Sequence, residues 1–63
     1  MLRMLEVVGT STEGFSAGVR SAVEAVVRAG QKPHFFQVVE QRGSVRDGAI
    51  GEFQVVLKIA VES

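Results

Sequence analysis

The sequence predicts an α+β domain in which one amphipathic helix packs on a three-stranded sheet, in the order strand, helix, strand, strand. Two observations carry this prediction. In residues 53–61 every odd position is large and apolar, which is the period of a strand with one buried face. Between residue 14 and about residue 29, apolar residues recur three and four positions apart, which is the period of an amphipathic helix. Such a chain has room for a single two-layer core.

The first strand is expected over residues 3–8, ending at Gly9. The four residues that follow, 10–13, fit a capping box, in which Thr10 accepts a hydrogen bond from the amide of Glu13 and the Glu13 side chain reaches back. We therefore expect the helix to begin at this segment.

The helix is expected to stop at Gly30, which tolerates a left-handed conformation, and Pro33 prevents its continuation. The chain then re-enters the sheet near His34 as a second strand, with a bulge or kink expected at Gly43. The pair Asp47–Gly48 is a strong turn signal and predicts a hairpin between the second and third strands.

The predicted core takes one face of the helix and one face of each of the last two strands: Phe15, Val19, Val23, Val26, Phe36, Val38, Phe53, Val55, Leu57 and Ile59. Strict alternation places the side chains between them on the opposite sheet face: Phe35, Gln37, Val39, Gln54, Val56 and Lys58. This opposite face is too apolar for ordinary solvated surface, and the chain is too short to cover it. We expect another copy of the chain to cover it, with or without a ligand.

The composition of the 63-residue chain excludes several classes of protein. Without cysteine it has no disulfide and no thiolate metal site, and the single histidine, His34, cannot build a closed zinc site unless several carboxylates converge on it. The formal net charge is zero and the charges are dispersed, so we expect neither nucleic acid nor an anionic membrane as partner.

No enzyme class is indicated by the chemically active side chains. The chain lacks cysteine and tyrosine, and no adjacent acid pair offers a general acid and base, so we expect no catalytic residue. The apolar N-terminal segment is interrupted by Arg3 and Glu6 and is shorter than a signal or spanning segment. These features predict a cytoplasmic protein without a membrane anchor.

Several short segments, in their order and spacing, resemble the dodecin family: residues 7–14, 35–38, 42–43, 47–48, 53–55 and 57–58. The resemblance covers nearly the whole chain and implies one dodecin-like domain over residues 1–63. It implies a β-α-β-β protomer with a three-stranded antiparallel sheet wrapped around its helix, assembled as a hollow homododecamer. It also implies stacked pairs of a flavin, either flavin mononucleotide (FMN) or riboflavin, at subunit interfaces, for storage or sequestration and not for catalysis.

The resemblance also implies three cofactor-binding residues. Gln54 matches a glutamine that hydrogen-bonds the polar edge of the isoalloxazine, and its amide offers both a donor and an acceptor. Arg42 matches an arginine near the ligand, where a guanidinium meets phosphate or stacks on a ring. Phe35 stands where flavin-binding dodecins carry a tryptophan, and it still offers a π face for stacking.

The chain departs from the dodecin pattern at three positions. Phe35 is smaller and less electron-rich than tryptophan, so flavin affinity is expected to fall. His34 replaces an aspartate of many dodecins, and Glu62 replaces an arginine of some bacterial members, which favours riboflavin over FMN.

Structural roles without a flavin stay open for these residues. Phe35 alternatively only fills a subunit contact, and Glu40, Arg42 and Lys58 alternatively form an intersubunit set of ion pairs. The protein is then a dodecin-like shell that has lost flavin and holds another small molecule, an ion or nothing.

Overall fold

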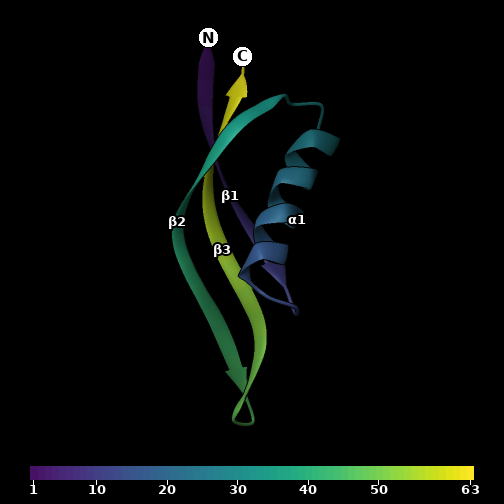
Figure 1. Cartoon of the computed structure of the whole chain (residues 1–63), viewed down its shortest axis with the longest axis vertical. Coiled ribbons are helices and arrows are strands. Elements are labelled where there is room, and N and C mark those ends of the chain that lie inside the picture. Colours follow the sequence, from purple (N-terminus) through teal and green to yellow (C-terminus); the bar gives the residue numbers. More distant parts are fainter.

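Four elements follow one another in the computed structural model, which describes all 63 residues (Figure 1): β1 (Leu2–Ser11), α1 (Phe15–Arg28), β2 (Pro33–Arg46) and β3 (Ala49–Glu62). The last strand, β3, lies in the centre of the sheet and pairs antiparallel with both β1 and β2. The predicted α+β class and the predicted order of elements are therefore confirmed.

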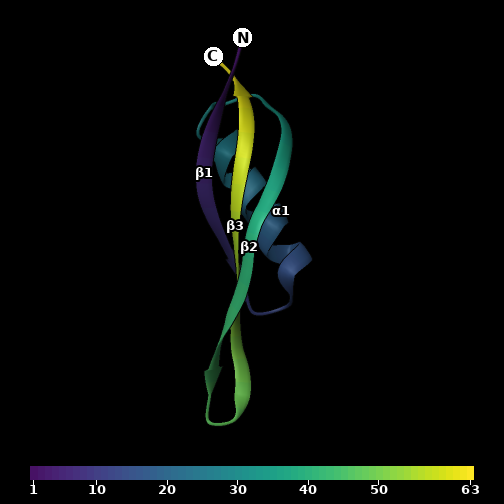
Figure 2. The same cartoon turned by 90° about the vertical axis from the view of Figure 1, so that its left-hand side faces the viewer.

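The helix connects the two outer strands across one face of the sheet. Because β1 and β2 are both antiparallel to β3, they run parallel to each other on its two sides. In Figure 2 the three strands lie in front of α1, and in Figure 1 the sheet bows with its concave side toward the helix. The chain ends lie side by side, because Leu2 pairs with Glu62 and the Ser63 amide donates to the Met1 carbonyl at 3.0 Å.

The capping box predicted at Thr10 is wrong. Strand β1 continues to Ser11, so Thr10 pairs with Gln54 in the sheet and is not a cap. Gly14 is the N-cap of α1 and makes no side-chain capping bond, while the Glu13 amide donates to Ser11 Oγ at 2.9 Å. Strand β3 extends past the partner of Gly9, so Thr10 and Ser11 pair with Gln54 and Phe53. Thr10 therefore stays in the sheet and does not cap the helix.

The predicted helix stop at Gly30 is confirmed. Gly30 has φ +88°, its amide donates to the Val27 carbonyl at 3.0 Å, and the Gln31 amide donates to the Val26 carbonyl at 3.2 Å. These two bonds form a Schellman motif, which satisfies carbonyls at the end of α1.

The helix comes closest to β1 and β3 at two glycines, Gly9 of β1 and Gly18 of α1. A Cβ on Gly9 would lie 2.0 Å from the carbonyl oxygen of Gly18, and a Cβ on Gly18 would lie 2.6 Å from Cγ2 of Val55. Only residues without a Cβ therefore allow α1 to approach the sheet this closely.

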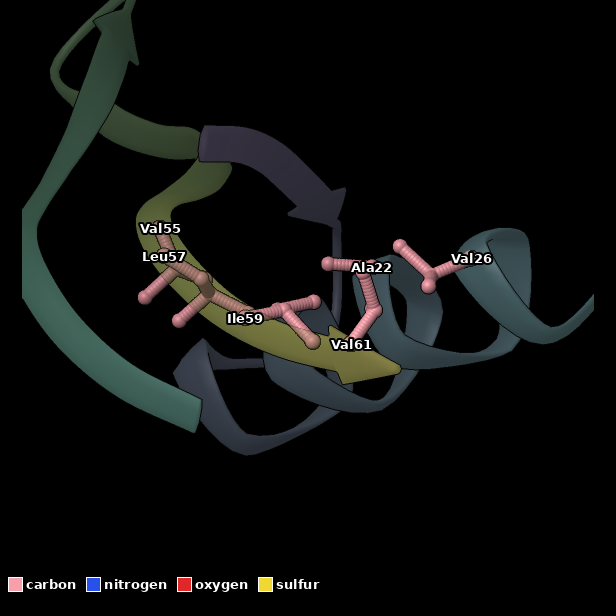
Figure 3. Close-up of a cluster of buried hydrophobic side chains, with 6 residues drawn as sticks. All are labelled: Ala22, Val26, Val55, Leu57, Ile59 and Val61. Atoms are coloured by element: carbon pink, nitrogen blue, oxygen red, sulfur yellow. The ribbon is translucent and has the colours of Figure 1, made fainter. Parts of the chain in front are cut away.

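The core lies between α1 and β3, as the close-up in Figure 3 shows, and consists of Ala22, Val26, Val55, Leu57, Ile59 and Val61. The core face predicted for β3 is confirmed, since Val55, Leu57, Ile59 and Val61 are fully buried in one cluster with α1 residues. On the opposite face of β3, Ala60 is buried as well and Val56 is only 9% exposed. Val19 and Val23 pack against this cluster and are partly buried.

The predicted core residues of β2 are not buried in the single chain. Phe36 pairs with Ile59 and Val38 with Leu57, so both lie on the helix side, yet they are 50% and 36% exposed. The reason is the placement of α1, which packs mainly on β1 and β3 and leaves β2 largely uncovered.

The hairpin between β2 and β3 extends past the start of α1 (Figure 1). Its turn residues Asp47 and Gly48 have φ of 54° and 79°, as a type I′ turn requires, so the predicted hairpin is confirmed. The bulge predicted at Gly43 is wrong, because Gly43 pairs with Phe53 and the register shifts lie elsewhere. A Cβ there would lie 2.8 Å from the carbonyl oxygen of Glu52, which explains the glycine.

Candidate functional site

The candidate site residues lie on the sheet face that points away from α1, which we call the outer face. Side chains alternate along a strand, and residues paired across strands share a face. Because Val55, Leu57, Ile59 and Val61 pack against α1, the even residues of β3 and their strand partners form the outer face over its central rows: Met4, Glu6, Val8, Thr10, Phe35, Gln37, Glu40, Arg42, Gln54, Val56, Lys58 and Ala60. Phe35, Arg42 and Gln54 thus share this face.

A bulge at Val39 brings Arg42 to the outer face. Val38 pairs with Leu57 and Glu40 pairs with Val56, so Val39 has no partner on β3. Strict alternation, which also assigned Val39 to the outer face, is therefore interrupted at Val39, and Glu40 lies opposite Val56 on the outer face. If Val39 paired with Val56 in a regular ladder, Arg42 would pair with Phe53 on the helix side; because Val39 bulges, Arg42 stands opposite Gln54.

Four side chains form a hydrogen-bonded polar cluster at this end of the outer face: Glu40, Arg42, Glu52 and Gln54. Arg42 Nε donates to Gln54 Oε1 at 2.9 Å, and Arg42 Nη1 donates to Glu40 Oε2 at 3.2 Å. Gln54 Nε2 donates to Glu52 Oε1 at 3.0 Å. The glutamine amide is thereby held between a guanidinium and a carboxylate.

Glu52 is the member of the polar cluster that sequence reasoning missed as a site residue. Its position two residues before Gln54 on one strand is the signal that both side chains share a face. Of the ion pairs considered from the sequence, Arg42 and Glu40 form one within the chain, with both side chains about half exposed.

Phe35 lies at the other end of the outer face, opposite Ala60, and is 55% exposed. Next to it, His34 Nε2 lies 3.3 Å from Glu62 Oε1, and both of these side chains are about half exposed. Two of the three departures from the dodecin pattern therefore contact each other, and they link the start of β2 to the end of β3.

The structure brings Arg42 and Gln54 together but does not bring Phe35 to them. Ala60, the partner of Phe35, is six residues from Gln54 along β3, a path of about 20 Å at about 3.3 Å per residue. None of the pockets of the single chain includes Arg42 or Gln54. Within one chain, Phe35 and the pair of Arg42 and Gln54 are therefore two separate features of the outer face.

The structure shows neither a candidate metal site nor a membrane-spanning helix. The structure gathers no group of three or more His, Asp or Glu side chains that could hold a metal ion. Helix α1 lacks the length and the apolarity to cross a membrane.

The fold defines a class of small β-α-β-β proteins in which a long antiparallel sheet bows around one helix, and known proteins share it. The dodecin family model matches residues 1–62. A curated dodecin of Thermus thermophilus is 33% identical over 57 residues, which cover 90% of this chain and 83% of that protein. The chain therefore belongs to the dodecin family, and the resemblance predicted from the sequence is confirmed.

Solved dodecin structures agree with the fold throughout. The dodecin from Streptomyces davaonensis has a TM-score of 0.93 at 33% identity, with 97% of this chain and 90% of that chain covered. The dodecin from Streptomyces coelicolor has a TM-score of 0.92 at 38% identity, with 100% and 94% covered.

Proposed function

We propose that this protein stores or sequesters a flavin, riboflavin or FMN, without catalysing a reaction, and that it does so as a hollow homododecamer. The observation that carries the proposal is the outer face. It carries Phe35 at one end and the hydrogen-bonded pair of Arg42 and Gln54 at the other. The membership of the chain in the dodecin family supports the same function.

The size and burial of the single chain support assembly. Its radius of gyration is 12.6 Å, whereas a compact 63-residue domain is expected to have about 10.6 Å. Its accessible surface is 4337 Å², against about 3950 Å² expected for a folded monomer of 6.8 kDa. Large apolar side chains such as Phe36 and Ile50 stay at least half exposed, so further copies are needed to cover them.

The separation of Phe35 from Gln54 supports a flavin site between copies. In this arrangement Phe35 of one copy stacks on the isoalloxazine and Gln54 of another binds its polar edge. Stacking contributes about 0.5–1.5 kcal/mol beyond the buried area.

No catalytic step belongs to the proposed site. The polar cluster holds one guanidinium, two carboxylates and an amide, with no nucleophile beside a base. A cytoplasmic location stays a prediction from the sequence.

Fluorescence titration of riboflavin and FMN tests the proposed function, because flavin emission is lost when the ring stacks on an aromatic side chain. We expect saturable quenching by the wild-type protein, tighter binding by Phe35→Trp, and weaker binding by Gln54→Leu. The matched control is Gln41→Leu, which removes an amide from β2 that makes no side-chain hydrogen bond in this structure.

Assembled wild-type protein that quenches neither flavin would overturn the flavin proposal. The departures at Phe35, His34 and Glu62 then favour the second candidate, a dodecin-like shell that holds another small molecule or an ion.

A further inference from the structure

We infer that Arg42 and Glu52 act as positioning residues that fix which way the amide of Gln54 faces. The site therefore selects ligands that carry an unsubstituted imide edge. This inference rests on the proposed function, because it concerns the same flavin site. It gives Arg42 a different role from contact with a ligand phosphate, and it gives Glu52 a role that the family resemblance did not imply.

The direction of the amide follows from donor and acceptor chemistry. A guanidinium only donates hydrogen bonds, so Arg42 Nε, at 2.9 Å, must meet the oxygen of the Gln54 amide. A carboxylate only accepts them, so Glu52 Oε1, at 3.0 Å, must meet the nitrogen. Inverting the amide would replace two charge-assisted hydrogen bonds by two repulsive contacts.

The fixed amide keeps one donor and one acceptor for a ligand. Gln54 Oε1 has a second lone pair, and Gln54 Nε2 has a second N–H. A ligand group that complements both is an N–H beside a C=O, which is the imide edge of an isoalloxazine. A methyl group on the imide nitrogen removes the donor and adds bulk, so we expect the site to reject N3-methylated flavins.

The charges of the polar cluster argue against phosphate recognition by Arg42. Its guanidinium already donates to Glu40 at 3.2 Å as well as to Gln54, and Glu52 adds a second carboxylate. A phosphate would approach one cation and two anions, which disfavours its binding. Arg42 is therefore expected to contribute equally to the binding of riboflavin and of FMN.

The test titrates riboflavin, FMN and N3-methylriboflavin against the wild-type protein, Arg42→Leu, Arg42→Lys, Glu52→Leu and Glu52→Gln. We expect Arg42→Leu and Glu52→Leu to weaken riboflavin and FMN by the same factor, roughly three- to tenfold, as for the loss of one hydrogen bond. Arg42→Lys and Glu52→Gln keep a donor and an acceptor and should restore most of the affinity. Arg20→Leu removes an unpaired guanidinium from exposed α1 surface and is the control.

The comparison of ligands distinguishes positioning from direct contact. In the wild-type protein N3-methylriboflavin should bind at least tenfold more weakly than riboflavin, and this discrimination should shrink in Arg42→Leu. A loss in Arg42→Leu that is larger for FMN than for riboflavin would show contact with phosphate and overturn the inference. Equal binding of riboflavin and N3-methylriboflavin by the wild-type protein would also overturn it.

A second measurement without ligand separates failure of this inference from failure of the proposed function. The side-chain NH₂ resonances of Gln54 report its hydrogen bonds, and Arg42→Leu and Glu52→Leu should each shift them while Arg20→Leu does not. Unchanged resonances would overturn the inference whether or not flavin binds. Shifted resonances in a protein that binds no flavin would support the fixed amide and refute the flavin function.

Discussion

Replacement of Phe35 by alanine separates the two roles that the sequence left open for this residue, ligand stacking and subunit contact. Phe35 is 55% exposed in the single chain, and a phenylalanine carries about 200 Å² of surface, so about 110 Å² remains to be covered by assembly or by a ligand. At about 25 cal/mol per Å², covering this area stabilises the complex by about 2.8 kcal/mol. If subunits cover it, Phe35→Ala should raise the dissociation constant of the contact about 100-fold.

Sedimentation equilibrium over a range of protein concentrations measures this change, and flavin fluorescence measures stacking in the same samples. Phe35→Leu is the informative partner variant, because leucine keeps apolar area and removes the π face. The proposed flavin role predicts that Phe35→Leu assembles almost as well as the wild-type protein but quenches riboflavin poorly. Equal quenching by Phe35→Leu and wild type would refute stacking by this residue. Val27→Ala, which trims a 52%-exposed side chain of α1, controls for general loss of apolar surface.

Three further predictions concern the backbone that builds the site. Gly9→Ala places a Cβ 2.0 Å from the Gly18 carbonyl oxygen, so we expect about 1–3 kcal/mol of lost stability in urea unfolding; an unchanged midpoint would contradict the close packing. Gly48→Ala, at φ 79°, should cost about 1 kcal/mol, while Gly48→Asn should cost less, and calorimetry of the two variants checks this order. Deletion of Val39 removes only the extra residue, so Glu40 and Arg42 should keep their partners Val56 and Gln54 and flavin affinity should be retained; a loss as large as in Arg42→Leu would contradict this register.

The strands and the helix were predictable where one local pattern decides the structure. The alternation of β3 identifies its buried face, because β3 is the central strand and its odd residues meet α1. The helix stop at Gly30 and the turn at Asp47–Gly48 need φ values that few other residues adopt, so they too are visible in the sequence.

Features that depend on strand partners could not be predicted from the sequence alone. Thr10 has the chemistry of a helix cap, but pairing with Gln54 keeps it in β1. The bulge at Val39 arises from the register between β2 and β3, and no local signal marks it. Phe36 has the right face for the core, but the position of α1 over β1 and β3 leaves it exposed.

The candidate site was predictable in part. The outer-face positions of Phe35 and Gln54 follow from alternation, and the structure places both there. Arg42 reaches this face only through the bulge, and its hydrogen bond to Gln54 depends on that register. A single glutamate in the sequence does not indicate a binding role. Glu52 gains one only because its carboxylate accepts a hydrogen bond from the Gln54 amide.

Sedimentation velocity of the protein with riboflavin is the decisive experiment for a flavin-binding dodecamer. It follows the flavin by its visible absorbance and the protein by its far-ultraviolet absorbance. We expect flavin absorbance to move with a single species of about 82 kDa, twelve times the 6.8 kDa of one chain. A folded 6.8 kDa monomer, or an 82 kDa species that leaves the flavin behind, would contradict it.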